Sequence, residues 1–428
     1  MKRSLSPVLF VLFIAVLFSG CSKSGSNPSP KNTGSKVTVA SLSTSTGPYT
    51  TIVTITGTGF STAAANNQVT FNGHTAIVQA ASSTQLLTTV PLAAGTGAVT
   101  VTINGTTATG PIFTYQVAQV VTPFAGSGHS GSADGKGAAA TFNQPNGLAT
   151  DAAGNVYVAD QENNLIRKIT PDGTVSTLAG SGQSGHDDGT GVTASFNNPQ
   201  GVATDAAGNV FVADSYNYLI RKITSSGVVS TIAGNSSSQP ANGQGTAASF
   251  SRPSDVVVDG SGNIFVADQG AGQIRKITSA GLVSTVYSSG DLNPYQLAVD
   301  KLGNIYAPDP TDNDIKKISQ SGVLTRFAGN GNIIGGDIDG TGTGAAFYQP
   351  IGIAIDGNGN LFVVDKYNGL IREITPAAVV TTVGGRGATN PYGPVAHAIL
   401  FGVQGIAVDT GGNIYFTSDN EIRKISMQ

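Results

Sequence analysis

The sequence predicts an all-β protein in which a six-bladed β-propeller follows a small β-sandwich. The main observation is a block that recurs six times: Asp-x-x-Gly-Asn, a short apolar strand, Asp, and then Ile-Arg-Lys-Ile or a close variant. A unit of this size cannot bury its apolar face alone and must stack on its neighbours. Low charge, abundant Gly and few Met also favour turn-rich β structure. The turn of the block begins at six aspartates: Asp151, Asp205, Asp259, Asp300, Asp356 and Asp409.

Residues 1–20 have the layout of an export signal. A basic start precedes an apolar run from Val8 to Phe18, and small residues precede Cys21. The run is short for a membrane-spanning helix. Residues 17–21, Leu-Phe-Ser-Gly-Cys, resemble the lipobox of bacterial lipoproteins, although Leu stands one place earlier than usual.

That resemblance implies cleavage before Cys21 and lipidation of this residue, which would anchor the chain to a membrane without spanning it. An ordinary secretory signal followed by an unrelated cysteine is the alternative. Because Cys21 is the sole cysteine, no disulfide within the chain is expected. Ser22 and Lys23 carry no acidic retention signal, so analogy with lipoproteins favours the outer membrane and leaves a periplasmic or surface-facing position open.

Residues 21–36 are expected to form a lipid-anchored flexible linker. Residues 22–36 are Ser, Lys, Gly, Asn, Pro and Thr and hold nothing to bury. The whole chain has a formal net charge of −3, and no basic run follows the first three residues. Binding to nucleic acid needs clustered Lys and Arg, so we expect no nucleic-acid partner.

Residues 37–116 alternate apolar and polar side chains in about seven short runs, which predicts a sandwich of antiparallel strands. Residues 55–60, Ile-Thr-Gly-Thr-Gly-Phe, and 69–73, Val-Thr-Phe-Asn-Gly, resemble the immunoglobulin-like IPT/TIG family. The resemblance implies a spacer or interaction module without chemistry of its own. His74 is interpreted as a solvated loop residue, since a metal site would need partner ligands.

Residues 120–428 hold the repeat, in which each copy predicts four strands. In the first copy these are 147–150, 156–159, 165–169 and 175–179, joined by Gly-containing turns. Four antiparallel strands repeated radially make propeller blades. The second copy contains Asn-Pro-x-Gly-Val-Ala-x-Asp, Gly-Asn-Val-Phe-Val-Ala-Asp and Leu-Ile-Arg-Lys-Ile, and it resembles the NHL repeat family.

The two ends of the repeat region complement each other. The sixth copy stops after its third strand, at 421–426, whereas residues 121–126 match the outer strand of the first copy, 175–180. We therefore expect strand 120–126 to supply the fourth strand of the last blade and to close the ring. Pro123 is acceptable there because an outermost strand has one edge without ladder bonds.

The charged residues of the repeat admit a catalytic or a structural interpretation. Asp160 and Arg167 recur seven residues apart in most copies, and repetition favours a structural ion pair. The Asp-Gly segments at 187–189 and 337–340 resemble calcium loops, so a weak ion site is an alternative to simple turns. Glycine-rich stretches at 126–131 lack the helix and parallel sheet of a dinucleotide site.

A propeller enzyme would need ligands that converge on the central channel. The outer-to-inner connections and the loops after Val-Ala-Asp must share one face, here called the loop face. The residues that begin the inner strands on this face are neutral, and Asp255 alone adds a charge beside them. A metal-dependent hydrolase needs several ligands, so we predict no catalytic residue, no metal and no cofactor. The inner-strand positions are Asn146, Gln200, Ser254, Tyr295, Ile351 and Gln404.

The connection into the fourth copy is shortened between Val286 and Pro294. We predict that the missing loop opens a notch in the loop face, bordered by Tyr287, Asp291, Asn293 and Tyr295. Tyrosine suits protein or sugar contacts, although each ring could instead pack a neighbouring loop. The predicted ligand-binding residues are Asn146, Gln200, Tyr216, Tyr218, Tyr287, Asp291, Asn293, Tyr295, Tyr348, Tyr367 and Gln404.

These observations predict a monomeric, non-catalytic exported lipoprotein whose loop face binds a polysaccharide or a protein. Similar domain pairs occur in outer-membrane glycan-handling systems, which favours polysaccharide by analogy, whereas the absence of Trp weakens a sugar-stacking platform. A protein–protein scaffold of the cell envelope is one alternative. A metal-dependent propeller lyase or lactonase is the other.

Overall fold

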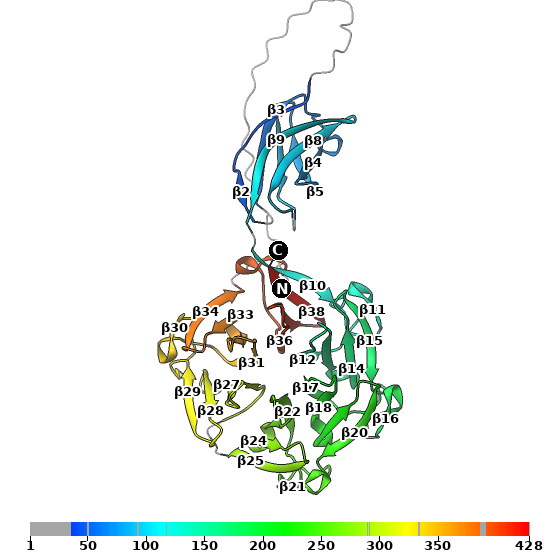
Figure 1. Cartoon of the computed structure of the whole chain (residues 1–428), viewed down its shortest axis with the longest axis vertical. Coiled ribbons are helices and arrows are strands. Elements are labelled where there is room, and N and C mark those ends of the chain that lie inside the picture. Colours follow the sequence, from blue (N-terminus) through cyan, green and yellow to red (C-terminus); the bar gives the residue numbers. More distant parts are fainter. Residues whose placement is uncertain are drawn as a thin grey trace, which may run out of the picture.

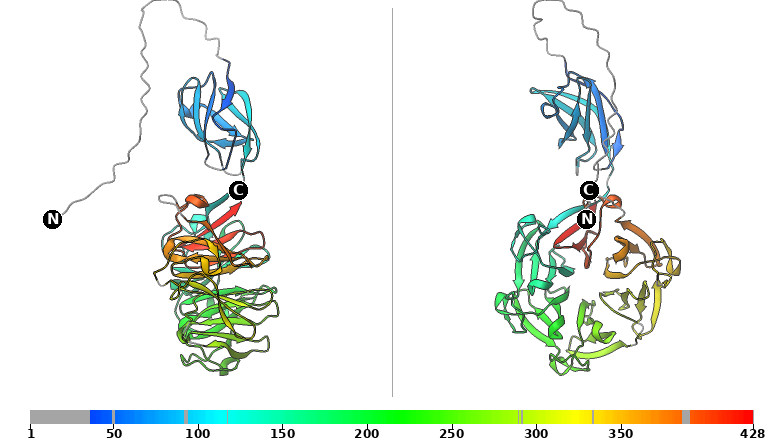
Figure 2. Two further views of the ribbon diagram at one scale, coloured as in Figure 1. Left: turned by 90° about the vertical axis from the view of Figure 1, so that its left-hand side faces the viewer. Right: turned by 180° about the vertical axis from the view of Figure 1, so that it is seen from behind.

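The computed structural model describes residues 36–48, 51–91, 94–116, 118–288, 290, 292–332, 334–385 and 391–427. The predicted signal segment and Cys21 lie outside these residues, and so does Asp291. The described chain forms a β-sandwich and six sheets arranged as a ring (Figure 1), so the predicted fold class is confirmed. Figure 2 shows the sandwich beyond the rim of the ring. None of the helices in the described part has the length and apolar character to cross a membrane.

The sandwich has two sheets that enclose one core. Its centre includes Val53, Phe71 and Phe113, and the two phenylalanine rings meet edge to face at 5.2 Å. His74 is exposed, as expected, but lies on a strand rather than in a loop. In order across each sheet, the strands are β1 (Thr38–Leu42), β3 (Ile52–Thr58), β7 (Gln85–Thr89) and β6 (Val78–Ala81), and β2 (Thr46–Gly47), β9 (Thr106–Tyr115), β8 (Gly97–Ile103), β4 (Gln68–Phe71) and β5 (His74–Ala76); η1 (Ala64–Asn66) precedes β4.

Each blade runs from an inner strand beside the channel to outer strands at the rim. From inside to outside, the first three blades are β12 (Pro145–Thr150), β13 (Val156–Asp160), β14 (Leu165–Ile169), β15 (Thr174–Ala179) and β11 (Gly135–Lys136); β17 (Pro199–Thr204), β18 (Val210–Asp214), β19 (Leu219–Ile223), β20 (Val228–Ala233) and β16 (Gly189–Thr190); and β22 (Pro253–Val258), β23 (Ile264–Asp268), β24 (Gln273–Ile277), β25 (Leu282–Ser288) and β21 (Gly243–Gln244).

The last three blades follow the same order. They are β26 (Ala298–Val299), β27 (Ile305–Asp309), β28 (Asp314–Ile318) and β29 (Leu324–Ala328); β31 (Pro350–Ile355), β32 (Leu361–Asp365), β33 (Leu370–Ile374), β34 (Val379–Gly384) and β30 (Gly340–Thr341); and β36 (Ile406–Val408), β37 (Ile414–Ser418), β38 (Glu421–Met427), β10 (Gln119–Ala125) and β35 (Gly393–Pro394).

Single 3-10 turns occupy the loops of the blades. The turns η3 (Gln161–Asn163), η5 (Ser215–Asn217), η7 (Gln269–Ala271) and η9 (Lys366–Asn368) follow second strands. The turns η2 (Gly137–Ala139), η4 (Gly191–Thr193), η6 (Gly245–Ala247), η8 (Gly342–Gly344) and η10 (Val395–His397) follow the short outermost strands.

The prediction of four strands per blade is wrong for five of the six sheets. A two-residue strand from the long outer-to-inner connection adds to the rim edge, as when Gly135 pairs with Val175. Such a strand is too short to produce an alternating pattern in the sequence. Among the described residues the fourth blade has four strands, because its connection is the shortened one. The first inner strand also begins earlier than predicted, at Pro145, since a bulge interrupts its pairing before Leu148.

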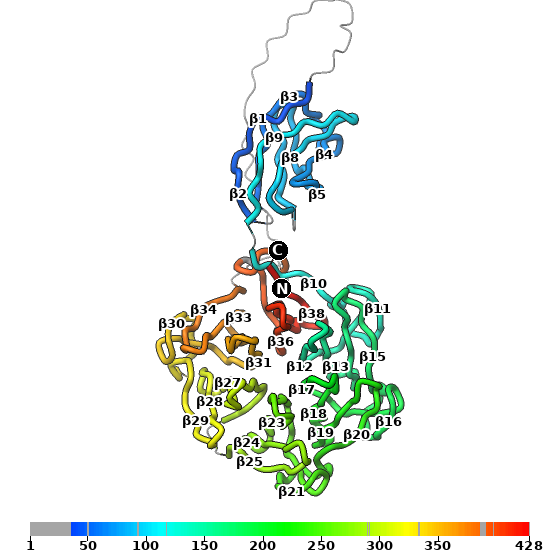
Figure 3. The backbone as a smooth tube through the Cα atoms, viewed as in Figure 1, coloured from blue at the N-terminus to red at the C-terminus, as the bar shows by residue number. Residues whose placement is uncertain are grey.

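The ring is closed by strands from both ends of the repeat region. β10 pairs antiparallel with β38 from Gln119 opposite Met427 to Ala125 opposite Ile422, and Figure 3 shows the two segments side by side. β35 pairs only with Val120 and Val121 on the other edge of β10. Pro123 lies past that pairing and next to a bulge, where its missing N–H costs no ladder bond.

Val121 provides a test of this closure, because its side chain is 1% exposed and packs in the core between the fifth and sixth blades. A Val121→Asp variant should lose several kcal/mol of unfolding free energy, since it buries a carboxyl group without a partner. Calorimetry should show a lower transition temperature for the propeller. The matched control is Val228→Asp at an exposed outer-strand position, which should change little. Equal transition temperatures for the two variants would contradict the closure.

Candidate functional site

The repeated aspartate and arginine residues form structural ion pairs inside the blades. In the first blade, Arg167 Nη1 donates to Asp160 Oδ2 at 2.8 Å and Arg167 Nη2 donates to Asp134 Oδ1 at 2.7 Å. The guanidinium lies over Phe142, with 5.2 Å to the ring centroid. It also donates to the carbonyls of Thr141 and Ala133. One buried cation therefore ties the third strand to the second strand and to the outer connection.

The second and fifth blades repeat this arrangement, and its geometry bears on the calcium alternative. Arg221 binds Asp188 at 2.8 Å and Arg372 binds Asp339 at 2.7 Å. These aspartates belong to the two Asp-Gly segments that resemble calcium loops. Because an arginine already neutralises each of them, the segments act as anchors for the connection.

The fourth blade departs from the pattern because Lys316 replaces the arginine. Three carboxylates, of Asp309, Asp312 and Asp314, offer oxygens within 4.8 Å of one another, a spacing that could hold a metal ion. The Lys316 ammonium lies among them, 2.7 Å from Asp312 and 2.8 Å from Asp314. Arg326 adds a second cation at 2.5 Å from Asp314. The positive charge that a metal ion would bring to these carboxylates is thus supplied by two side chains of the protein, Lys316 and Arg326.

The central channel opens on the loop face into a polar hollow of about 550 Å³, here called the mouth. Carboxamide side chains dominate its wall, and Lys366 and Asp419 are its charged residues. Three predicted site residues come together there: Asn146, Tyr295 and Gln404. The complete lining is Gln144, Pro145, Asn146, Gln161, Tyr295, Lys366, Gly402, Gln404, Asp419 and Asn420.

Tyr295 reaches across the channel from the fourth blade to the first, on the opposite side of the ring. Its hydroxyl oxygen accepts a hydrogen bond from Asn146 Nδ2 at 2.9 Å, and the same amide donates to Gln161 Oε1 at 3.0 Å. Burial raises the pKa of Tyr295 above its ordinary value, so the hydroxyl stays protonated at neutral pH. Burial also lowers the pKa of Lys366, whose ammonium lies 3.5 Å from Gln404 Oε1.

Gln200 lies behind this wall. Its Nε2 donates to Asn198 Oδ1 at 3.2 Å, and Gln161 Nε2 donates to the same oxygen at 3.0 Å. A chain of amide hydrogen bonds therefore links the mouth to the second blade. Gln200 Oε1 is buried and has no hydrogen-bond partner within the described part of the protein.

The remaining predicted residues are spread over the loop face. Tyr348 and Tyr367 are 37% and 55% exposed, and their rings meet edge to face at 5.1 Å. Tyr216 is also exposed, on η5. Tyr218 is half-buried and adopts a left-handed backbone with φ of 57°, which is strained for a bulky side chain.

The predicted notch is not one surface. Tyr295 lies in the mouth, whereas Asn293 lines a separate hollow of about 430 Å³ with Tyr348. Tyr287 lies on β25, opposite Ile274. Leu292 and Leu297 of this segment are buried in the core between the third and fourth blades, which draws them away from the surface.

Sequence reasoning missed several residues of the mouth: Gln144, Gln161, Lys366, Asp419 and Asn420. A signal for two of them was present. Gln161 and Lys366 each directly follow the aspartate that ends the second strand, so they occupy equivalent positions in their repeats. They are the first residues of loops that were predicted to share the loop face.

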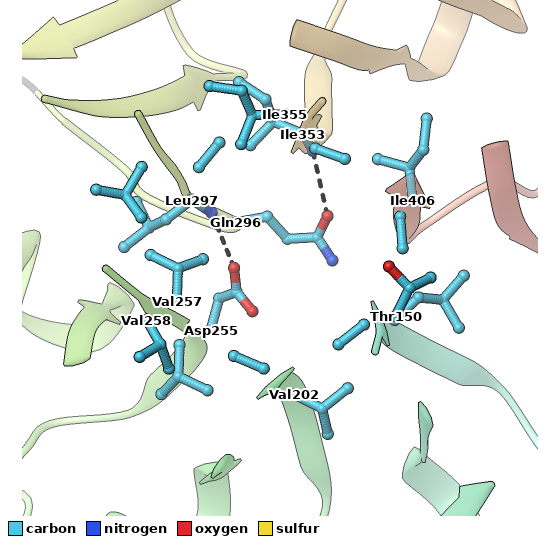
Figure 4. Close-up of a pocket in the computed structure, with 18 of the residues that line it drawn as sticks. Thr150, Val202, Asp255, Val257, Val258, Gln296, Leu297, Ile353, Ile355 and Ile406 are labelled. Atoms are coloured by element: carbon cyan, nitrogen blue, oxygen red, sulfur yellow. Dashed lines mark hydrogen bonds between the residues drawn. The ribbon is translucent and has the colours of Figure 1, made fainter. Parts of the chain in front are cut away.

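Asp255 lies below the mouth and faces the channel (Figure 4). It is 6% exposed, and its Oδ2 accepts a hydrogen bond from the backbone N–H of Leu297 at 2.8 Å. Burial raises the pKa of Asp255 to about 8, against the opposing effect of hydrogen bonds from Leu297 and Val256. This carboxyl group is therefore largely neutral at pH 7.

Comparisons with known proteins support both parts of this architecture. The model of the IPT/TIG domain matches residues 37–116, and the model of the NHL repeat matches residues 142–169 and 196–223. The predicted resemblances to these two families are thus confirmed: the chain has an NHL-repeat propeller after an N-terminal IPT/TIG domain.

Two curated relatives cover most of the chain but are themselves much longer. Protein SUPPRESSOR OF QUENCHING 1, chloroplastic, of Arabidopsis thaliana is 29% identical over 305 residues, which are 69% of this chain and 26% of that protein. NHL repeat-containing protein 2 of Homo sapiens is 25% identical over 333 residues, 71% of this chain and 41% of that protein. The chain thus spans less than half the length of either relative.

Two solved structures share the whole arrangement. An auxiliary nutrient binding protein from Bacteroides thetaiotaomicron superposes with a TM-score of 0.68 at 18% identity, covering 92% of this chain and 98% of that one. A protein described in the same words from Bacteroides ovatus gives a TM-score of 0.61 at 18% identity, with the same coverage of both chains. At this identity the likeness establishes the fold.

The buried ion pairs can be tested in the second blade. An Arg221→Met variant leaves Asp214 buried without its cation, so unfolding free energy should fall by about 3–5 kcal/mol. Chemical denaturation measures this loss. The matched control is Lys222→Met at the neighbouring, partly exposed position, which should cost far less. A similar loss of unfolding free energy in both variants would show that the Arg221–Asp214 ion pair contributes no more to stability than the neighbouring lysine does.

Asp255 predicts a pH dependence of stability. Its pKa is raised in the folded state, so the folded protein retains a proton that the unfolded chain releases, and stability should fall as pH rises towards about 8. The interval from pH 7 to 8 reports mainly on this group, because burial raises the pKa values of Asp214 and Asp365 only to about 6. An Asp255→Asn variant should lose this slope in denaturation experiments across the interval. An unchanged slope would contradict the prediction.

Proposed function

We propose that the protein is a non-catalytic, exported lipoprotein whose loop face binds a polysaccharide. The observation that carries the proposal is the mouth, which gathers the carboxamides of Asn146, Gln161 and Gln404 with the hydroxyl of Tyr295. Carboxamides and hydroxyls both donate and accept hydrogen bonds, as sugar hydroxyls do. The exposed rings of Tyr348 and Tyr367 add flat apolar surface on the same face.

The charges of the mouth favour binding over catalysis. Two proteins with the same architecture are described as auxiliary nutrient binding proteins. Among the described residues, Asp419 is the one carboxylate in the lining of the mouth, whereas a metal-dependent lyase or lactonase needs several converging ligands.

A protein partner is the second candidate, and a cluster of exposed aromatic rings favours it. Phe401 is exposed, and it lies close to Gly369, two residues after Tyr367. Aromatic side chains are enriched in protein interfaces. A protein ligand would make the chain a scaffold of the cell envelope.

The proposed location follows from the predicted lipidation at Cys21. A Cys21→Ser variant expressed in a bacterium with lipoprotein processing should leave the membrane fraction, as judged by fractionation and immunoblotting. Protease treatment of intact cells would distinguish a surface-facing from a periplasmic protein. Persistence of the variant in the membrane fraction would contradict a lipid anchor.

A glycan array and a protein array probed with the purified chain test the proposed function. A Tyr348→Ala/Tyr367→Ala variant should bind the selected glycan about tenfold more weakly, because each aromatic contact supplies about 0.5–1.5 kcal/mol. The matched control is Leu302→Ala, an exposed apolar residue in a Gly-Asn hairpin on the opposite face. Selection of proteins and no glycan would favour the scaffold. If Tyr348→Ala/Tyr367→Ala and Leu302→Ala weakened glycan binding equally, the loop face would not be the binding surface.

A further inference from the structure

A second cavity lies in the channel below the Tyr295–Asn146 bridge. It has a volume of about 200 Å³ and is lined by the inner strands of all six blades (Figure 4). Most of the side chains that line it are apolar, with Val202, Val256, Ile353 and Ile406 among them. Two side chains break this apolar surface with strongly polar groups, Asp255 and Gln296.

Asp255 and Gln296 depart from the repeat at one equivalent position. Four blades have glycine there: Gly147, Gly201, Gly352 and Gly405. A Cβ at Gly147 would lie 2.5 Å from the Gln200 carbonyl, and one at Gly405 would collide with the Asn146 carbonyl. The repeat thus uses glycine where inner strands approach closely. At this one position of the inner strand, the third and fourth blades alone carry a side chain.

Both polar side chains are held by neighbouring backbone and turn their remaining atoms to the cavity. Asp255 accepts from Leu297 N–H at 2.8 Å and also from the backbone N–H of Val256, and Gln296 Oε1 accepts from Ile353 N–H at 3.3 Å. Figure 4 shows the second oxygen of Asp255 and the amide nitrogen of Gln296 near the middle of the cavity. If Asp255 served only to hold the backbone next to the short strand β26, a single acceptor oxygen would be enough. An asparagine side chain would supply that oxygen.

Asp255 also lacks an arginine partner of the kind that accompanies three other buried aspartates. Asp160, Asp214 and Asp365 each contact an arginine of their own blade. Asp255 takes part in none of the ion pairs found among the described residues. The nearby Arg252 instead donates to Gln269 Oε1 at 2.8 Å.

The cavity continues towards the face that carries the Asp-x-x-Gly-Asn hairpins. Its lining includes the last residues of inner strands, such as Thr150, Thr204 and Val258, which directly precede these hairpins. These residues are partly exposed. The bridge of Tyr295 and Asn146 lies on the other side, so the cavity and the mouth are reached from opposite faces.

We propose that this cavity binds a small organic ammonium ion, which donates hydrogen bonds to Asp255 and lays its apolar body against the valine and isoleucine wall. An ammonium group supplies the charge that the buried carboxylate lacks. A calcium ion fits less well, because its sites are built around several charged oxygens, whereas Asp255 is the one carboxylate among the described residues that line the cavity. Binding ionises Asp255 and releases its proton to solvent.

The test is calorimetric titration of the purified chain with phenethylammonium chloride at pH 8.5. We expect saturable binding of one ion per chain. The neutral isostere 2-phenylethanol should bind at least tenfold more weakly. Asp255→Asn, which keeps the acceptor for Leu297, should weaken ammonium binding at least tenfold. Val258→Phe, which fills the opening without touching Asp255, should also weaken it.

Three results would overturn the proposal: no saturable binding to the unaltered chain, equal affinity of the ammonium ion for Asp255→Asn, or equal affinity of the chain for the neutral alcohol. Calcium chloride that binds in an Asp255-dependent way without competition from the ammonium ion would also overturn it. Thermal unfolding confirms that each variant is folded. The Tyr348→Ala/Tyr367→Ala variant should retain the ammonium affinity, so this outcome is independent of the function proposed for the loop face.

Discussion

The buried arginine of the third strand is the contact on which the blades depend. In the first blade it joins an aspartate of the second strand, an aspartate and two carbonyls of the outer connection, and the face of a buried phenylalanine. A buried ion pair is weak evidence for net stability, because desolvation offsets much of the attraction. Its geometry is specific, however, and it fixes a long irregular loop against a regular sheet.

Much of the fold was predictable because a repeated local pattern specifies each blade. The Asp-x-x-Gly-Asn turns and the apolar alternation predicted the inner four strands, and the match of residues 121–126 to 175–180 led to the pairing of β10 with β38. The two-residue rim strands escaped prediction since they carry no periodic signal. Their pairing depends on loops that fold back over distances the sequence pattern does not encode.

The candidate site was only partly predictable, because it is built where the repeat is broken. Asn146, Tyr295 and Gln404 were correctly placed at the channel by counting positions in the repeat. Asn293 and Tyr295, which were predicted to border one notch, line separate hollows, because Leu292 and Leu297 of the same segment are buried. The contact between Tyr295 and Asn146 joins opposite blades, and a local sequence pattern cannot predict a contact across the ring.

The closing strand has a mechanical consequence. β10 follows directly after the sandwich, so the chain that leads towards the N-terminus leaves the ring through Gln119. Gln119 is paired with Met427, next to the C-terminal end. A pulling force between a ligand bound to the propeller and an attachment upstream of the sandwich would therefore act first on this terminal residue pair. The ring would then open by separation of β10 from β38. The five blades formed from continuous chain would stay intact.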